Sequence, residues 1–490
     1  MTGRAGDPGE ASLPELAEDF DDLGSIVGSG LRRVRSLLAE IARHPGWFRA
    51  PTRLTYVAEL ERTASRHEDL LGVLMGRAAQ AATADVGELA SLLEEKRAMV
   101  DVVRAEVGLA AAVMISADWQ SPSATSSLGP AAGRHAGSIT PHHDDYKRDR
   151  HHDAAAFEQA YLDANVDPRH AGVRAIMTSC GMSAFSTILA YLLLEDRLDG
   201  PVVIGRTTYH ECAALLRSTF GSALVEVDES CPGAVAQAIG RHSPGAVFLD
   251  SLCNADGVVV PDLRDAIRAL AELTSGHAYL VIDNSCLSAA FQPLSLIPRT
   301  VRNISPIVFE SLTKYPQLGL DRTTSGMILA CGEDAQALDD YREHLGTNVS
   351  EISPLIVPPP DRAIMARRLA RIGRNAERLA LLLADHCRVE HPSLASHVSH
   401  AVADRLTFRG GLLTVSMPDG GHDDVVERAI GEAARRGVAL VAGTSFGFDT
   451  TRVYAVSGAS GPFLRIAAGT ETIAELPALA DVFIAALGGT

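Results

Sequence analysis

Lys314 is the residue of this 490-residue chain that is best suited to covalent chemistry. It stands in the segment Ser311 to Tyr315, downstream of an apolar run, Ala278 to Ile282, that leads into Asp283. A lysine amine condenses with an aldehyde, and an aspartate at the end of a buried strand can keep a pyridine nitrogen protonated, which makes the ring an electron sink. The pattern therefore predicts a site for pyridoxal 5'-phosphate (PLP), with Lys314 as the residue that forms the Schiff base.

Lysine is rare in the chain, and this narrows the candidates. The other lysines are Lys96 and Lys147. They lie in the charged runs Glu94 to Arg97 and Tyr146 to Asp149, which predicts solvated surface positions for both. Lys314 is therefore the candidate that remains by elimination.

Composition excludes several classes of protein. A chain of 490 residues with 46% hydrophobic content can bury a large core in two or three domains. A formal charge of -17 disfavours nucleic acid as a partner. The apolar stretch Leu109 to Ile115 is far shorter than the roughly 20 residues of a membrane span, and the first residues show no secretory signal, so we expect a cytoplasmic protein that does not bind membranes. The seven cysteines stand singly, which predicts reduced thiols.

The first third of the chain predicts helices and a connecting arm. Apolar residues recur at three- and four-residue spacing from Leu16 to Val113, so residues 1–120 are expected to form an N-terminal helical extension that packs on the rest or stabilises an oligomer. Small residues and proline dominate from Ser121 to Ser138, which predicts a linker or arm over residues 121–153.

The remainder predicts an α/β protein with two parts. Over residues 154–340, short apolar runs alternate with helical segments, as in a mainly parallel sheet covered by helices. Residues 341–490 predict a smaller C-terminal α+β domain, with a long helix from Arg362 to Asp385 and strands at Leu412 to Ser416 and Gly437 to Val441. The apolar runs of the larger part are Val202 to Ile204, Ala246 to Leu249, Ala278 to Ile282, Pro306 to Phe309 and Gly326 to Leu329.

A turn of small residues is the candidate phosphate site. Thr178 to Ala184 precede an apolar helix, Phe185 to Leu194, whose first N–H groups could hold a phosphate. An ordinary capped helix would have the same local sequence. The order along the chain, with the turn before Asp283 and Lys314, favours the phosphate site.

These motifs resemble the Cys/Met metabolism family of fold-type I PLP-dependent enzymes, which includes cystathionine γ-synthase, cystathionine lyases and methionine γ-lyase. The resemblance runs from about Asp145 to Thr470. It implies that Tyr146 and Arg148, in a Tyr-x-Arg motif, reach the phosphate of a neighbouring subunit. The active site would then lie at the interface of a homodimer or homotetramer.

The same resemblance assigns further contacts. It implies that Tyr209 stacks on the cofactor ring and assists proton transfer, and that Arg465 binds the substrate carboxylate with help from Ser445; a structural tyrosine and a surface arginine are the plainer alternatives. His210 and Glu211 replace small residues of the family, which puts the usual substrate in question. The residues implied to bind the cofactor are Lys314, Asp283, Tyr209, Cys180, Gly181, Met182, Asn254, Ser311, Thr313, Tyr146 and Arg148, with Cys180 in place of a serine and Asp250 in place of a glutamate.

The histidines near the arm suggest a metal site at first sight. They are His142, His143, His151 and His152, in two adjacent pairs. Neighbouring residues of an extended segment point to opposite sides, so this spacing does not bring ligands together. We therefore expect no metal.

Together these features predict a PLP-dependent transferase or lyase that acts by γ-substitution or γ-elimination. The substrate would be an activated homoserine-type, sulfur-containing or sulfonium amino acid, S-adenosylmethionine included, in a specialised biosynthetic pathway such as that of a natural product. Lys314 would be the base, Asp283 would hold the ring nitrogen cationic and Tyr209 would move a proton. A β-lyase, decarboxylase or aminotransferase would share these contacts, and a non-catalytic interaction protein with this fold is a further alternative.

Overall fold

The computed structural model gives the arrangement of most of the chain. The structure describes residues 8–43, 51–81, 86–117, 152–170, 172–273, 276–298, 300–416, 422–458 and 461–488. Tyr146, Lys147 and Arg148, and the histidines at 142, 143 and 151, lie outside these described residues. Among the described residues, no helix is both long and apolar enough to span a membrane.

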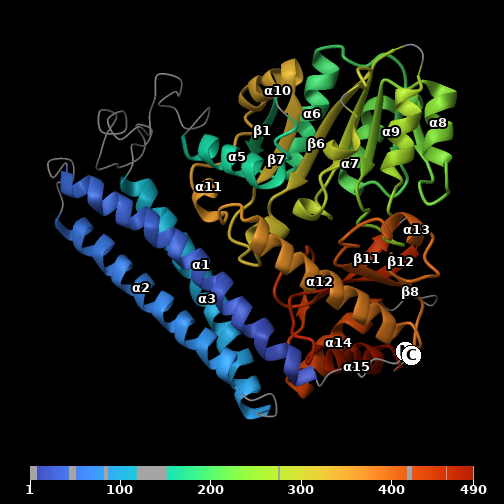
Figure 1. Ribbon diagram of the computed structural model, residues 1–490. Helices are drawn as coiled ribbons and strands as arrows, with labels where there is room; N and C mark the ends of the chain where they lie inside the picture. Colours follow the sequence, from blue (N-terminus) through green and yellow to red (C-terminus); the bar gives the residue numbers. More distant parts are fainter. Residues whose placement is uncertain are drawn as a thin grey trace.

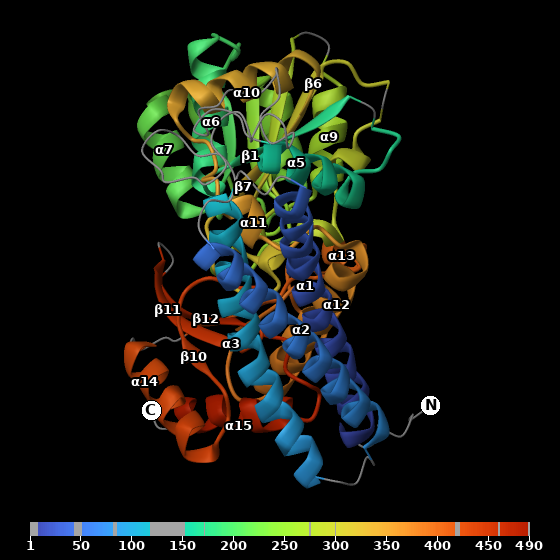
Figure 2. The ribbon, with the colours of Figure 1, turned by 90° about the vertical axis from the view of Figure 1, so that its left-hand side faces the viewer.

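Three long helices form the N-terminal part (Figure 1). They are α1 (Pro8–Arg43), α2 (Pro51–Gln80) and α3 (Val86–Ala117). Apolar side chains such as Phe20, Leu71 and Leu92 are buried in one cluster that also includes residues of the C-terminal part. Because the extension shares this core, it is a packed layer of the molecule (Figure 2).

The larger part is a seven-stranded sheet in the order β1-β7-β6-β5-β4-β2-β3. The pairs from β6 through β5, β4 and β2 to β3 are parallel, while β7 pairs antiparallel with both β1 and β6. The α/β fold class is therefore confirmed. The strands are β1 (Val173–Thr178), β2 (Val202–Gly205), β3 (Leu224–Val227), β4 (Ala246–Asp250), β5 (Ala278–Asp283), β6 (Ile304–Ser311) and β7 (Gly326–Cys331).

Helices cover both faces of this sheet (Figure 1). Leu280 and Ile282 of β5 face one buried cluster, while Val281 between them faces the other. This explains why the strand is a continuous apolar run instead of an alternating one. The covering helices are α5 (His152–Asn165), α6 (Gly181–Leu194), α7 (His210–Phe220), α8 (Ala234–His242), α9 (Leu263–Ala271) and α10 (Gly332–Leu345), while the short α11 (Ser353–Ile356) contacts α3 and α5.

The C-terminal part is a five-stranded sheet in the order β10-β11-β12-β9-β8, with helices packed against it. The prediction of a strand at Gly437 to Val441 is wrong. Gly437 directly follows α14 with a φ of 68°, and only Val441–Ala442 form a strand, β10.

The domain boundary proposed after residue 340 falls inside α10, so the division into domains stays a proposal. The elements are α12 (Arg362–Leu383), β8 (Val389–Glu390), α13 (His400–Ala403), β9 (Leu412–Ser416), α14 (His422–Arg436), β10 (Val441–Ala442), β11 (Arg452–Gly458), β12 (Gly461–Ala467) and α15 (Leu476–Leu487).

An acidic row on α1 faces a basic row on α12. Arg371 forms ion pairs with Asp19 and with Glu18, the latter at 2.9 Å. Neighbouring pairs join Arg367 to Asp22 and Arg374 to Glu15. Residues three or four apart lie on one side of a helix, so the two rows run along one contact.

Lys96 of α3 joins the same network, which overturns the prediction that it is solvated. Its side chain is buried, and Nζ lies 2.7 Å from Asp19 Oδ2 and donates to the Thr470 carbonyl oxygen at 3.1 Å. The charged run around it suggested exposure, but the partner on α1 is 77 residues away in sequence.

Arg371→Met is expected to destabilise the protein. The Arg371 side chain is 7% exposed, and its removal leaves the carboxylate of Asp19 with one cation fewer in a buried contact. We expect the free energy of unfolding to fall by about 3 kcal/mol. Arg378→Met, at an exposed position of the same helix, is the control and should change it by less than about 0.5 kcal/mol in denaturant titrations. Equal losses in the two variants would contradict this role for the ion pairs.

Candidate active site

Lys314 follows β6 and lies half-buried in a turn. Its Nζ donates a hydrogen bond to Ser445 Oγ at 2.7 Å and lies 5.1 Å from the centre of the Phe446 ring. Burial, and then the charge of Arg465, lower the pKa of Lys314. A lowered pKa increases the fraction of neutral amine, which is the form that attacks an aldehyde.

The loop that holds Lys314 in place is strained. Ser445 has a φ of 68°, in the left-handed region that residues with a side chain seldom adopt. At Gly447, a Cβ atom would lie 2.9 Å from the carbonyl carbon of Lys314, so only glycine allows this close approach. Such strain is a feature of functional sites.

Asp283 ends β5 beside a second buried carboxyl group. The backbone N–H of Ser285 donates to Asp283 Oδ1 at 2.8 Å, and Asp250 at the end of β4 is its register partner. Burial raises the pKa of both groups, and the charge of Asp283 raises the pKa of Asp250 further. Because Ser285 and Lys314 stabilise the ionised form of Asp283, we infer that Asp283 carries the negative charge and Asp250 the proton.

The candidate phosphate turn lies against the segment that precedes Lys314. Cys180 caps α6, with Sγ accepting from the N–H of Ser183 at 3.3 Å, so the first N–H groups of the helix, those of Gly181 and Met182, remain for a ligand. A Cβ atom on Gly181 would lie 2.9 Å from Cβ of Ser311. The structure therefore brings the turn and Ser311 together.

Three further residues named from the sequence lie around the same region. Arg465 Nη1 donates to Asn254 Oδ1 at 2.9 Å, and burial lowers the pKa of Arg465. The backbone N–H of Tyr209 donates to Asp250 Oδ2 at 3.2 Å. Burial, and then the charge of Glu211, raise the pKa of the Tyr209 phenol.

The residues present fit PLP. Lys314 supplies the amine, Asp283 a buried carboxylate for the ring nitrogen, and the start of α6 supplies donors for the phosphate. Two buried hydroxyl oxygens, Thr208 Oγ1 and Ser251 Oγ, have no hydrogen-bond partner among the described residues. Thr208 directly precedes Tyr209, and Ser251 directly follows Asp250. Two hydroxyl groups that could bind a ligand therefore lie at the ends of the strands, where ligands bind in this fold.

Two residues that hold the site together, Ser285 and Glu229, were not predicted from the sequence. Ser285 supports Asp283 and also accepts, through its Oγ, a hydrogen bond from the N–H of Ser311 at 2.8 Å. Glu229 accepts from the N–H groups of Arg206 and Thr207 at 2.7 and 2.9 Å and so fixes the turn that leads to Tyr209. Glu229 is buried, but no sequence signal separates it from surface acids. Ser285, two residues after Asp283, fits an Asx-type turn and could have been expected.

This fold and the arrangement around Lys314 define a fold-type I PLP-dependent enzyme. Residues 124–431 match the family described as Cys/Met metabolism PLP-dependent enzymes. The chain belongs to this family, whose members are described as PLP-dependent enzymes. Membership disfavours the alternative of a non-catalytic interaction protein.

Solved structures share the fold at low sequence identity. Cystathionine γ-synthase of Xanthomonas oryzae pv. oryzae, in complex with cystathionine, is similar with a TM-score of 0.60 and 21% identity, over 72% of this chain and 89% of that one. A methionine γ-lyase of Micromonospora echinospora has a TM-score of 0.56 and 20% identity, over 70% and 88%.

A curated fungal relative is more similar in sequence. It is the bifunctional enzyme flvA of Aspergillus flavus, 28% identical over 327 residues, which are 64% of this chain. The chain spans 38% of the length of this relative.

Proposed function

We propose that the protein catalyses γ-substitution or γ-elimination on an activated homoserine-type, sulfur-containing or sulfonium amino acid, in a specialised biosynthetic pathway. The observation that carries the proposal is the half-buried amine of Lys314, which donates a hydrogen bond to Ser445 and is influenced by the charges of Asp283 and Arg465. The similar solved structures named above are a γ-synthase and a γ-lyase, which supports reaction at the γ-carbon.

The side chains divide the work of such a reaction. Bound PLP would supply an electron sink that stabilises negative charge at the substrate's α-carbon. Lys314 Nζ, as a neutral amine, would accept the proton from the α-carbon, pass it on to the electron sink and, neutral again, accept one from the β-carbon. Asp283 holds a negative charge opposite the ring nitrogen. We propose that Tyr209 donates a proton to the leaving group, since its phenol keeps its proton at neutral pH.

Arg465 is the proposed partner of the substrate carboxylate. Its half-buried guanidinium contacts an amide oxygen, not a carboxylate, within the described residues, so its charge is available to an anionic ligand. A guanidinium presents two parallel donors to a carboxylate and so fixes the orientation of an amino acid. Binding of the substrate would replace the Asn254 contact and free Asn254 for the cofactor.

Arg465→Lys is expected to raise KM for an amino-acid substrate with a smaller effect on kcat. Lysine keeps the charge but loses the paired donors, and the loss of about 2 kcal/mol corresponds to a rise in KM of about 30-fold. Steady-state kinetics test this, with Arg388→Lys at an exposed position of the same domain as the control. A fall in kcat with an unchanged KM would contradict a role in binding the carboxylate.

Product analysis tests the reaction itself. Purified enzyme with PLP is incubated in turn with an O-acylhomoserine, cystathionine, methionine and S-adenosylmethionine, with and without a thiol nucleophile. We expect release of the γ-leaving group from one of them. Release of carbon dioxide or amino-group transfer, with no γ-product from any of these substrates, would overturn the proposal in favour of a decarboxylase or an aminotransferase.

We further propose a homodimer or homotetramer, with Tyr146 and Arg148 completing the phosphate site of the neighbouring subunit. The N–H groups at the start of α6 and Ser311 form only part of a phosphate shell, which leaves room for such a contribution. Arg148→Gln is expected to raise the Kd for PLP about tenfold. PLP titration followed by light scattering tests both parts, and an active monomer would contradict the shared site.

A further inference from the structure

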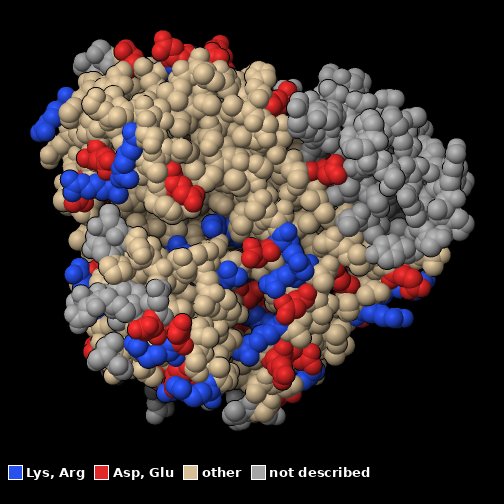
Figure 3. Space-filling view, turned by 180° about the vertical axis from the view of Figure 1, so that it is seen from behind, with Lys and Arg blue, Asp and Glu red and all other residues tan. Residues whose placement is uncertain are grey.

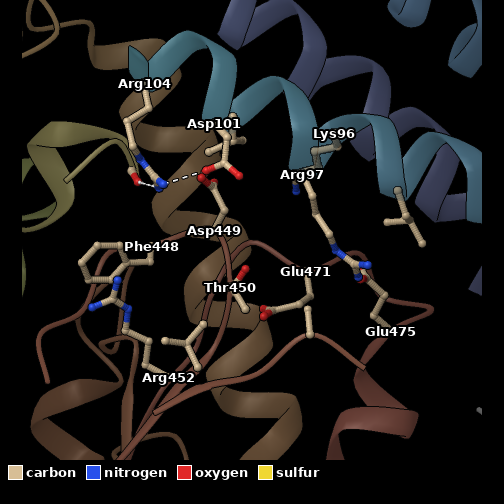
Figure 4. Close-up of a pocket in the computed structure, with 15 residues that line it drawn as sticks. Lys96, Arg97, Asp101, Arg104, Phe448, Asp449, Thr450, Arg452, Glu471 and Glu475 are labelled. Carbon is tan, nitrogen blue, oxygen red and sulfur yellow. Dashed lines mark hydrogen bonds and ion pairs between the residues drawn. The ribbon is translucent and has the colours of Figure 1, made fainter. Parts of the chain in front are cut away.

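A cavity separate from the Lys314 site lies between the N-terminal extension and the C-terminal part. Its volume is about 310 Å³, which is at the lower end of the range of small-molecule sites. Figure 4 shows that α3 forms one wall, with Arg97 and Arg104, while Phe448, Arg452 and Glu471 come from the opposite side. The face of the molecule in Figure 3 is hollowed near its centre, and basic and acidic side chains gather around the hollow.

Most charged groups that line this cavity already have partners. Arg97 pairs with Glu475 at 3.0 Å, and Arg104 pairs with Asp101 at 2.8 Å. Asp449 accepts a hydrogen bond from Arg368 at 2.7 Å. Lys96 pairs with Asp19, as described above. These groups build the walls and leave little charge for a ligand.

Arg452 is the cation that remains available. Its guanidinium carbon lies 3.2 Å from the centre of the Phe448 ring, so the two groups are stacked. It donates to the Thr444 carbonyl oxygen at 3.2 Å, and its carboxylate partner, Asp321, lies 3.9 Å away, beyond hydrogen-bond distance. Stacking fixes the plane of the guanidinium, so its remaining donors are oriented before a ligand arrives.

Glu471 is the acid that remains available. It is 5% exposed, and its Oε1 accepts from the N–H of Thr451, whereas its Oε2 is buried without a hydrogen-bond partner among the described residues. Burial raises the pKa of Glu471 to about 7. A buried carboxyl oxygen without a partner is costly, which is a reason to expect a donor from a ligand.

We propose that this cavity is a second amino-acid binding site, in which Arg452 holds the carboxylate of a free α-amino acid and Glu471 accepts a hydrogen bond from its ammonium group. A cation with one distant carboxylate partner and an acid with one oxygen that accepts no hydrogen bond among the described residues lie on the same wall and match the two charges of a zwitterion. Phe448 and Val100 give apolar surface for the side chain of the ligand. The volume admits an amino acid.

The position of the cavity places this ligand against the segment that holds Lys314. Arg452 binds the carbonyl group of Thr444, the residue before Ser445, and Ser445 accepts the hydrogen bond from Lys314. On the other wall, Arg104 donates to the carbonyl oxygen of Leu320 at 2.8 Å. The ligand would therefore lie beside two arginines, Arg452 and Arg104, that each hold a segment close to Lys314.

Calorimetry with the reduced holoenzyme tests the proposal. Borohydride first fixes PLP to Lys314, so that an added amino acid cannot react with the cofactor. Each of the twenty common amino acids is then titrated into the protein, and we expect at least one to bind with a Kd below about 1 mM. Arg452→Gln and Glu471→Gln should each weaken binding at least about tenfold. If none of the twenty binds, the proposal is overturned.

Two controls separate this site from the active site and from general damage. Arg465→Gln, at the proposed substrate carboxylate site, should leave the Kd within about twofold, as should Arg435→Gln at an exposed position of α14. The glutamine in Glu471→Gln can still accept from the N–H of Thr451, so we expect this variant to keep its melting temperature. It therefore tests binding even if Arg452→Gln does not fold. Binding that is lost in Arg465→Gln but kept in Arg452→Gln and Glu471→Gln would assign the ligand to the active site and contradict the proposal. The assay measures binding alone, so its result does not depend on which reaction the enzyme catalyses.

Discussion

Lys314→Ala is expected to lower turnover by at least about 10⁴-fold. The substitution removes both the covalent anchor of PLP and the base that moves the substrate protons. Lys96 cannot replace Lys314, because its Nζ lies at the contact of α1 and α3 and is paired with Asp19. Rates of product formation and the visible absorbance of the bound cofactor measure the effect.

Lys314→Arg serves as the matched variant. Arginine keeps the positive charge and can donate to Ser445, but it cannot condense with an aldehyde at neutral pH. We expect it to be as inactive as the alanine variant and to bind PLP only non-covalently. A Lys314→Arg enzyme that kept more than about a tenth of its activity would show that covalent attachment at this residue is not required.

Asp283→Asn is expected to lower kcat by about 10³-fold, the second largest effect. Asparagine has nearly the same shape and can still accept the hydrogen bond from Ser285, but it removes the negative charge that favours a protonated ring nitrogen. Steady-state kinetics with saturating PLP measure the effect, because saturation separates loss of catalysis from loss of cofactor binding.

Asp250→Asn is the matched control from the neighbouring strand. If Asp250 is the protonated member of the pair, asparagine imitates its neutral form and can still accept from the N–H of Tyr209. We expect kcat to change less than about threefold. Equal losses in Asp250→Asn and Asp283→Asn would contradict the assignment of the charge to Asp283.

The strands that carry the site could be predicted because they are buried on both faces. Ala278 to Ile282 and Ala246 to Leu249 are continuous apolar runs, and such runs are strong signals of central parallel strands. The polar residue that ends each run, Asp283 or Asp250, then lies at the same edge of the sheet. For this reason the sequence predicted that Asp283 ends a buried strand, whereas Asp250 was named only through the family resemblance, in place of a glutamate.

The edge strands were harder to predict. The two end strands of the seven-stranded sheet are β1 (Val173–Thr178) and β3 (Leu224–Val227). Unlike the central strands, both contain residues that are partly exposed to solvent. Their short runs include charged residues, Arg174 and Glu226, which weaken the apolar pattern. Neither was recognised as a strand from the sequence.

Long-range contacts could not be predicted from local pattern. The burial of Lys96 depends on Asp19 of another helix, and the hydrogen bond of Lys314 depends on Ser445, 131 residues away. The cavity of Arg452 and Glu471 likewise exists only because α3 folds back over the C-terminal part. Spacing along a chain carries little information about such contacts, since they are set by packing.

Borohydride reduction of the holoenzyme followed by peptide mapping shows directly whether PLP is attached to Lys314. Reduction makes the link between PLP and its lysine permanent, so mass spectrometry of the digested protein identifies the residue. We expect one labelled peptide, with the label on Lys314, and no label in Lys314→Arg. A label on Lys96 or Lys147, or a protein that takes up no PLP, would contradict it.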